Sequence, residues 1–230
     1  MQIVTFQKLT LLDFPEKTAA IVFTPSCNFR CGYCHNPELV NFKDSQNLIP
    51  EKDFFDFLEK RKNLLDGICL TGGEPTLQKD LPQFLKKIHQ RGFLTKLDTN
   101  GSKPEILEKL LQAGLLDYVA MDVKASPENY ANVVGGDFAK AVETSRNLIM
   151  QSDVNYEFRT TLVKELVDEK EWQKILEFVR GAEKFFLQNF RVSGECLDKK
   201  FEKFHGFTTS ELKKMCEEAG RVVKKCEVRA

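Results

Sequence analysis

Short runs of apolar and β-branched residues alternate along this chain with longer stretches whose apolar residues recur at helical spacing. Six runs predict strands: Ala19 to Thr24, Gly67 to Thr71, Leu94 to Asp98, Tyr118 to Val123, Tyr156 to Thr161 and Lys184 to Gln188. Five stretches between them predict helices, near Glu51 to Asn63, Leu81 to Arg91, Pro104 to Ala113, Phe138 to Met150 and Glu169 to Arg180. Because each helix can carry the chain back to the start of the next strand, the alternation favours a parallel sheet.

The pattern predicts an α/β fold, an open barrel of six parallel strands with its site at the carboxyl ends of the strands. A chain of 230 residues can bury one sizeable core. We therefore expect a single domain over residues 1–230, with the barrel at about 15–190 and a C-terminal extension at 191–230. Within the extension, Ser210 to Val222 is typical of a helix, and Cys226 to Arg229 of a strand.

Charge and hydropathy argue against several classes of protein. The chain has 34 lysines and arginines and 34 aspartates and glutamates, so no net positive field would attract nucleic acid. No apolar run reaches the length of a membrane span, and the first residues lack the basic and apolar regions of a secretory signal. Seven cysteines without framework spacing fit a reducing compartment. We expect a cytoplasmic protein with neither a nucleic-acid nor a membrane partner.

Cys27, Cys31 and Cys34 form a CxxxCxxC array on a segment whose glycine, asparagine and proline residues predict a loop. Three thiolates on one short loop can bind one face of a 4Fe-4S cluster, which usually takes four cysteines. One iron is then left without a cysteine. Because an open iron can bind a substrate or cofactor, the array indicates reactive chemistry more than electron storage.

Two alternatives for the array remain open: a structural zinc site completed by His35, and unrelated buried thiols. Zinc sites usually have two separated pairs of ligands. The remaining cysteines do not supply a second pair, because they are scattered singly: Cys69, Cys196, Cys216 and Cys226. We expect Cys69, which lies on an apolar strand, to serve packing. The other three have no role that the sequence indicates.

Further chemistry lies where predicted strands end. Thr71 to Pro75 reads TGGEP, and its two glycines would let the backbone approach a ligand closely. Asp98, at the end of an apolar strand, should have a cation or hydroxyl partner, because burying a lone carboxylate is costly. Asp122 and Lys124 share one face of the next strand, and they could bind a ligand or simply pair with each other. Arg159 inside a barrel calls for a carboxylate.

Together these segments resemble a known family. The CxxxCxxC loop, with an aromatic residue before its last cysteine, and the later GGEP are similar to the radical S-adenosylmethionine (SAM) superfamily. Five segments resemble, within it, the anaerobic ribonucleoside-triphosphate reductase activating proteins, which are glycyl-radical enzyme activases: Leu11 to Pro15, Cys27 to Val40, Thr71 to Leu77, Lys96 to Gly101 and Tyr118 to Lys124. The resemblance runs from about Leu11 to Phe190.

The resemblance implies roles for the motif residues. Cys27, Cys31 and Cys34 would bind three irons of the cluster, and the fourth iron would bind the amino and carboxylate groups of SAM. Tyr33 would pack near the adenine. The remaining predicted cofactor-binding residues are Gly72, Gly73 and Glu74 for the methionyl amino group, Asp98, Asp122 and Lys124 for the cofactor and a monovalent cation beside it, and Arg159 as a carboxylate partner.

The implied reaction is reductive cleavage of SAM and transfer of the radical to a glycine of the partner, an anaerobic ribonucleoside-triphosphate reductase. A flavodoxin or ferredoxin type protein would supply the electron. Two alternatives to this activase remain: a radical SAM enzyme that acts on a small molecule such as a deazapurine, and a zinc-binding module.

Overall fold

The computed structural model describes residues 1–43, 48–192 and 194–229. The elements in chain order, with η for 3₁₀ helices, are β1 (Thr5–Thr10), β2 (Ala19–Thr24), α1 (Pro37–Val40), α2 (Glu51–Glu59), β3 (Gly67–Gly72), η1 (Pro75–Leu77), α3 (Leu81–His89), β4 (Leu94–Thr99), α4 (Pro104–Gln112), β5 (Tyr118–Asp122), η2 (Pro127–Asn129), α5 (Tyr130–Val134), α6 (Ala139–Gln151), β6 (Asn155–Leu162), α7 (Glu169–Phe178), β7 (Lys184–Asn189), η3 (Lys199–Lys203), α8 (Thr209–Ala219) and β8 (Lys225–Arg229).

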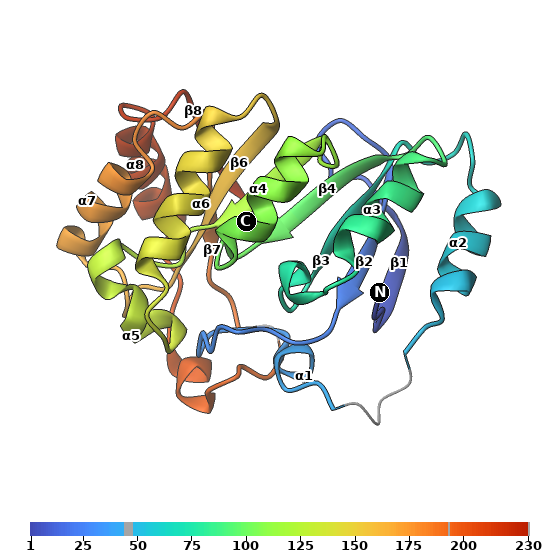
Figure 1. Ribbon diagram of the computed structural model, residues 1–230. Coiled ribbons are helices and arrows are strands. Elements are labelled where there is room, and N and C mark those ends of the chain that lie inside the picture. Colours follow the sequence, from blue (N-terminus) through green and yellow to red (C-terminus); the bar gives the residue numbers. More distant parts are fainter. Residues whose placement is uncertain (44–47, 193, 230) are drawn as a thin grey trace.

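Within the described residues, the strands form one eight-stranded sheet in the order β1 to β8. Strands β2 to β8 are parallel, and each pairs with the next along the chain. The first and last strands are not paired with each other, so the sheet is open. Helices α3, α4 and α6 lie in front of the curved sheet in Figure 1. This is the partial barrel that the alternation of strands and helices predicts.

The six predicted strands are β2 to β7, each correct to within one residue at either end. Strand β8 confirms the predicted strand in the extension, and β1 was not predicted. Of the residues in β1 only Thr10 is buried, so its sequence lacks the apolar alternation that identifies a strand. It pairs antiparallel with β2 at the edge of the sheet. The predicted six-stranded core therefore gains one strand at each edge.

The predicted helices α2, α3, α4, α6, α7 and α8 are all present, although α2 ends at Glu59 and not at Asn63. Asn63 has a left-handed φ of 71°, which an α-helix does not tolerate. Phe54 and Leu58 on α2 are fully buried, and Phe84 on α3 stacks on Phe54 with ring centroids 5.6 Å apart. The predicted apolar faces thus form the core between the helices and the sheet. No helix in the described ranges is long and apolar enough to cross a lipid bilayer.

An ion pair links β8 to β6, across the intervening strand β7. The guanidinium of Arg229 donates two hydrogen bonds, of 2.6 and 2.9 Å, to the fully buried carboxylate of Glu157 on β6. Tyr118 on β5 donates a third, of 2.9 Å. Cys216 on α8 and Cys226 on β8 are free thiols whose Sγ atoms lie 3.0 Å apart. The C-terminal extension is therefore built onto the same sheet as the site.

Candidate active site

The cysteine loop leaves the carboxyl end of β2 and is fixed by backbone hydrogen bonds. The Ser26 amide donates to the carbonyl of Leu39, at 2.8 Å, and the Arg30 amide donates to Val134 on α5, also at 2.8 Å. Ser26 itself has a left-handed φ of 68°. These contacts turn the chain out of the sheet, so that the cysteines that follow lie over the strand ends.

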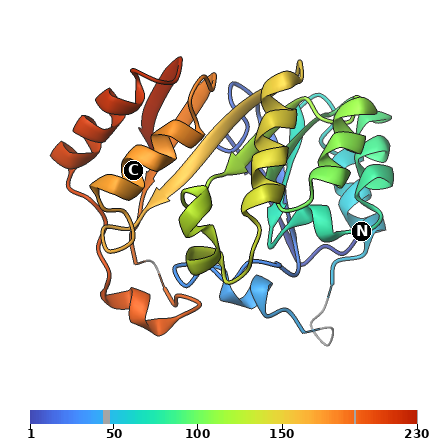
Figure 2. The same ribbon diagram turned by 60° about the vertical axis from the view of Figure 1, so that its left-hand side comes forward.

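The C-terminal extension closes the loop from the other side. The amides of Leu197 and Asp198 donate to the carbonyls of Cys34, at 3.1 Å, and Gly32, at 3.0 Å. The ring of Phe201 fills the space beside Gly32, where a Cβ atom would lie only 2.1 Å from it. In Figures 1 and 2 the blue cysteine loop and the orange segment of η3 lie at the same end of the molecule. The cysteine loop and the C-terminal extension, although distant in sequence, therefore pack against each other.

The TGGEP loop follows β3 and lies against the start of the cysteine loop. The Gly73 amide donates to the Thr24 carbonyl at 2.9 Å, and the Glu74 amide donates to Ser26 at 2.8 Å. A Cβ atom on Gly72, whose φ is 119°, would come within 2.3 Å of the Thr24 amide, and one on Gly73 within 1.9 Å of the Ser26 carbonyl. The two glycines are thus required for this close approach.

The Glu74 carboxylate ties this loop to the loop after β4. It accepts hydrogen bonds from the Thr76 amide and hydroxyl, at 3.1 and 2.5 Å, from the Thr99 hydroxyl at 2.7 Å and from the Asn100 amide at 2.7 Å. Its side chain is buried, and burial raises its pKa despite these donors. The carboxylate that the resemblance assigns to the methionyl amino group therefore already accepts hydrogen bonds from four protein donors.

A chain of ion pairs crosses the inner face of the sheet at the wall of the pocket. Arg159 on β6 donates from Nη1 to Asp98 at 3.0 Å and from Nε to Asp122 at 2.9 Å. Lys124 donates to the second oxygen of Asp122 at 3.0 Å, and buried Lys96 donates to the second oxygen of Asp98. The expected partners of Asp98 and Arg159 are confirmed. The pairing of Asp122 with Lys124 is confirmed too, with Arg159 as a further partner.

These pairs set the charge states of their members. Burial alone would raise the pKa of Asp122, but Arg159 and Lys124 outweigh it and lower this pKa to about 2. Burial likewise opposes the charged form of Asp98, and Arg159 and Lys96 together hold its pKa below the usual range. Burial would lower the pKa of Lys124, and Asp122 keeps it raised. The ion-paired side chains Asp98, Asp122 and Lys124 are therefore charged at neutral pH.

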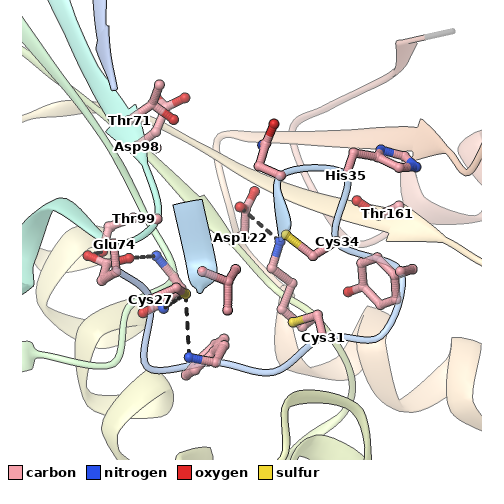
Figure 3. Close-up of a pocket in the computed structure, with 18 of the residues that line it drawn as sticks. Cys27, Cys31, Cys34, His35, Thr71, Glu74, Asp98, Thr99, Asp122 and Thr161 are labelled. Atoms are coloured by element: carbon pink, nitrogen blue, oxygen red, sulfur yellow. Dashed lines mark hydrogen bonds and ion pairs between the residues drawn. The ribbon is translucent and has the colours of Figure 1, made fainter. Parts of the chain in front are cut away.

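One pocket at the carboxyl ends of the strands collects the predicted site residues (Figure 3). Its cavity volume is about 220 Å³, and it is open to solvent on one side. All of the predicted residues line it: Cys27, Cys31, Tyr33, Cys34, Gly72, Gly73, Glu74, Asp98, Asp122, Lys124 and Arg159. Eight further residues line it, none of which was among the predicted cofactor-binding residues: Phe29, His35, Asn36, Val40, Thr71, Thr99, Asn100 and Thr161.

Two residues with clear contacts to the site were missed. Asn100 donates to the Cys27 sulfur at 3.8 Å and to the Asn28 side chain at 3.0 Å. It also lies in a turn, because the Ser102 amide donates to the Asn100 side chain and Gly101 has a φ of 73°. Lys96 is the second residue that was missed. A single lysine in an apolar strand is a weak signal of a functional residue. The polar character of the strand's inner face could have revealed it.

Cys69 is fully buried, as its predicted packing role requires, but its neighbours are polar. Its Sγ lies 3.6 Å from Asp98 and 3.7 Å from the Lys96 ammonium. It therefore lies beside the charged layer on the inner face of the sheet, which consists of the ion-paired side chains Lys96, Asp98, Asp122, Lys124 and Arg159. In the described residues, no three histidine, cysteine, aspartate or glutamate side chains form a site for a single metal ion.

A family model described as the Radical SAM superfamily matches residues 21–179. The chain belongs to the radical SAM superfamily. Among its relatives is a Methanocaldococcus jannaschii protein provisionally named a glycyl-radical enzyme activating enzyme, which is 32% identical over 94% of this chain and 89% of its own length. The pyruvate formate-lyase-activating enzyme of Clostridium pasteurianum is 29% identical over 83% of this chain and 82% of its own length.

Two further similarities complete the comparison. A protein of Thermococcus kodakarensis, named with less certainty as a GTP 3',8-cyclase, is 29% identical over 70% of this chain and 52% of its own length. The crystal structure of Streptococcus suis SuiB bound to S-adenosylmethionine is 16% identical, with a TM-score of 0.70 over 91% of this chain and 52% of that one. At this identity the likeness shows a shared fold.

Membership of the radical SAM superfamily makes the chain an enzyme and implies a 4Fe-4S cluster and SAM as cofactors. Family membership thus supports radical chemistry over a zinc-binding module. The pocket fits these groups. Cys27, Cys31 and Cys34 line it together, and burial raises the pKa of Cys27 to about 11 and of Cys31 to about 12. Such thiols stay protonated until a metal displaces the protons.

Tyr33, which lies between Cys31 and Cys34 on the cysteine loop, offers a polar group to the pocket. The Tyr33 hydroxyl is buried and has no hydrogen-bond partner within the described residues. Its ring is fixed edge-on against Phe190 and Phe201, with centroids 6.4 and 6.1 Å away. A buried hydroxyl without a partner is costly. Tyr33 is therefore available to a ligand in the pocket that it lines.

Proposed function

We propose that this radical SAM enzyme activates a glycyl-radical enzyme, and that its partner is an anaerobic ribonucleoside-triphosphate reductase. The observation that carries the proposal is the extent of the similarity. It covers most of the length of the two activating enzymes but only half of the GTP cyclase. The segments from Leu11 to Lys124 that resemble reductase activases support the choice of partner.

When bound, the cluster and SAM would supply the difficult chemistry, which is reductive cleavage of SAM and removal of a hydrogen atom from a glycine of the partner. The protein holds the parts in position. Cys27, Cys31 and Cys34 would bind three of the irons. Their loop is fixed on one side by Ser26 and on the other by the amides of residues 197 and 198. We propose a flavodoxin or ferredoxin type protein as the electron donor.

The pocket residues would orient SAM. Because its carboxylate already accepts four hydrogen bonds, Glu74 would hold the TGGEP loop in shape, while the backbone at Gly72 and Gly73 meets the amino group. Tyr33 would contact the adenine. Asp122 and Lys124, with charges fixed by their ion pair, would bind polar groups of the cofactor without a change of protonation.

Enclosure is the remaining requirement, since so reactive a radical must be kept from water. The apolar side chains of Phe29, Tyr33 and Val40 line the pocket beside the cysteines. All three are buried. A glycine, which has no side chain, is the residue that enters such a narrow space at least steric cost.

The decisive experiment combines the reconstituted enzyme anaerobically with SAM, a reductant and an anaerobic ribonucleoside-triphosphate reductase. We expect a glycyl radical signal in the electron paramagnetic resonance spectrum and one 5'-deoxyadenosine for each radical formed. Cys31→Ala, which removes a cluster ligand, should give neither. A parallel sample with pyruvate formate-lyase tests whether the reductase is the preferred partner.

A second function is favoured by the similarity to GTP cyclases: radical chemistry on a small molecule. In that case SAM would be cleaved with no glycyl radical on either partner, and a purine substrate would increase 5'-deoxyadenosine formation. That outcome would replace the activase by a small-molecule enzyme while leaving the family assignment intact.

A further inference from the structure

Lys96 is a buried cation that the proposed reaction does not use. It lies on β4, and only 1% of its side chain is exposed. Its ammonium donates to Asp98 and lies 3.7 Å from the Cys69 sulfur and 5.9 Å from the centre of the Tyr118 ring. Burial opposes its charge, yet Asp98 keeps its pKa raised, so the ammonium form persists. A charge buried at such cost calls for a function.

Strand geometry explains why Lys96 reaches Asp98. The two residues are separated by one position on β4, so both side chains point to the inner face of the sheet. Lys96 is paired in register with Cys69 on β3, and Asp122 with Arg159 on β6. The charged layer therefore extends across neighbouring strands. Asp98 belongs to the pocket wall, whereas Lys96 lies beneath it and does not line the pocket.

The charges of this layer do not balance. Three cationic side chains, Lys96, Lys124 and Arg159, surround two carboxylates, Asp98 and Asp122, which leaves one positive charge in excess among the described residues of the layer. Each of the four carboxylate oxygens already accepts a hydrogen bond from one of these cations. A metal cation placed here would meet three like charges and find no carboxylate oxygen without a partner.

We propose that the Lys96 ammonium is a built-in counterion of Asp98, which lets this site hold its two carboxylates without binding a monovalent metal cation. The family resemblance led us to expect such a cation beside Asp98, and the residues present do not fit one. Lys96 is a positioning residue that acts through Asp98. The inference rests on SAM binding in the site of the proposed function, but not on the identity of the partner.

The first test uses protein without cluster or SAM. Thermal unfolding is measured in sodium, potassium and tetramethylammonium chloride at equal ionic strength, together with the linewidth of ²³Na in nuclear magnetic resonance. We expect no difference between the salts and no specific broadening for the wild type. Lys96→Met should unfold at a higher temperature in sodium or potassium than in tetramethylammonium, and should broaden the ²³Na signal. Lys109→Met, at an exposed position on α4, controls for the loss of a lysine.

The second test measures SAM binding to the reconstituted enzyme in the same salts. The wild-type dissociation constant should change by less than about twofold, while Lys96→Met should bind about tenfold more weakly in tetramethylammonium and recover in sodium or potassium. A merely structural lysine would give no such rescue by salt. If Lys96→Met does not fold, Lys96→Gln takes its place, and the wild-type measurements still decide.

Saturable binding of sodium or potassium by the wild type would overturn the inference. So would a folded Lys96 variant that responds equally to all three salts. Neither measurement involves a glycyl radical, so failure of the partner assignment would leave this inference standing, and its own failure would leave the proposed activase untouched.

Discussion

Phe201 occupies the place that a side chain on Gly32 would need. A Cβ atom at residue 32 would lie 2.1 Å from one ring carbon of Phe201 and 2.6 Å from another. The ring cannot easily move away, because it packs against Tyr33 and lies 4.6 Å from the centroid of Phe204. The centre of the cysteine loop is therefore shaped by a residue of the C-terminal extension.

Gly32→Ala should consequently disturb the cysteine loop. We expect a loss of about 1–3 kcal/mol in the free energy of unfolding, as is usual for overpacking, together with a lower iron content after reconstitution. Chemical denaturation and iron analysis provide the measurements. In a Phe201→Ala background the same change should cost clearly less, because the clashing ring is gone. Equal costs in both backgrounds would show that Phe201 does not constrain residue 32.

Glu74→Gln should loosen the connection between the loops after β3 and β4. The amide has one acceptor oxygen, and its NH₂ group would face one of the donors that the carboxylate now accepts, such as the Asn100 amide. We expect a loss of about 1–3 kcal/mol of stability in the cluster-free protein and weaker SAM binding after reconstitution. Glu38→Gln, at an exposed position on α1, is the control. Unchanged stability would remove Glu74 from this structural role.

Asp122 should make the free energy of unfolding depend on pH in the acid range. Its pKa of about 2 in the folded protein is below the ordinary value of 3.8, so its contribution is complete above about pH 4 and is lost as the pH falls through 2. The contribution is on the order of 2 kcal/mol. Urea unfolding of the cluster-free protein at several pH values should show a shallower acid loss for Asp122→Asn. Parallel curves for the two proteins would contradict the assignment.

Asn100→Leu should alter the cluster through Cys27. The Asn100 amide donates to the Cys27 sulfur, and the Phe29 amide donates to the same sulfur at 3.4 Å. Hydrogen bonds to cluster sulfur stabilise the reduced state, so losing one should make the reduction potential more negative. A potentiometric titration followed by paramagnetic resonance measures the shift. Asn132→Leu, at an exposed position on α5, should leave the potential unchanged.

How much the sequence could predict depended on how local each signal was. Strands β2 to β7 carry continuous apolar runs, and the residues of the cysteine and TGGEP loops stand within short motifs, so both were found. Lys96 was missed because its role comes from Asp98 and Arg159, and Arg159 lies two strands away in the sheet. The contact between Gly32 and Phe201 was missed because the two residues are far apart in sequence and carry no shared pattern.

The hydrogen bonds from residues 197 and 198 to the cysteine loop also bear on the order of assembly. The cysteines leave the ribosome well before the amides that secure their loop, because these amides lie far downstream in the sequence. Until then the loop lacks both these donors and the ring that shapes its centre. Insertion of iron and sulfide is therefore expected after translation has passed this segment, so that the cell loads a folded receptor and not a nascent chain.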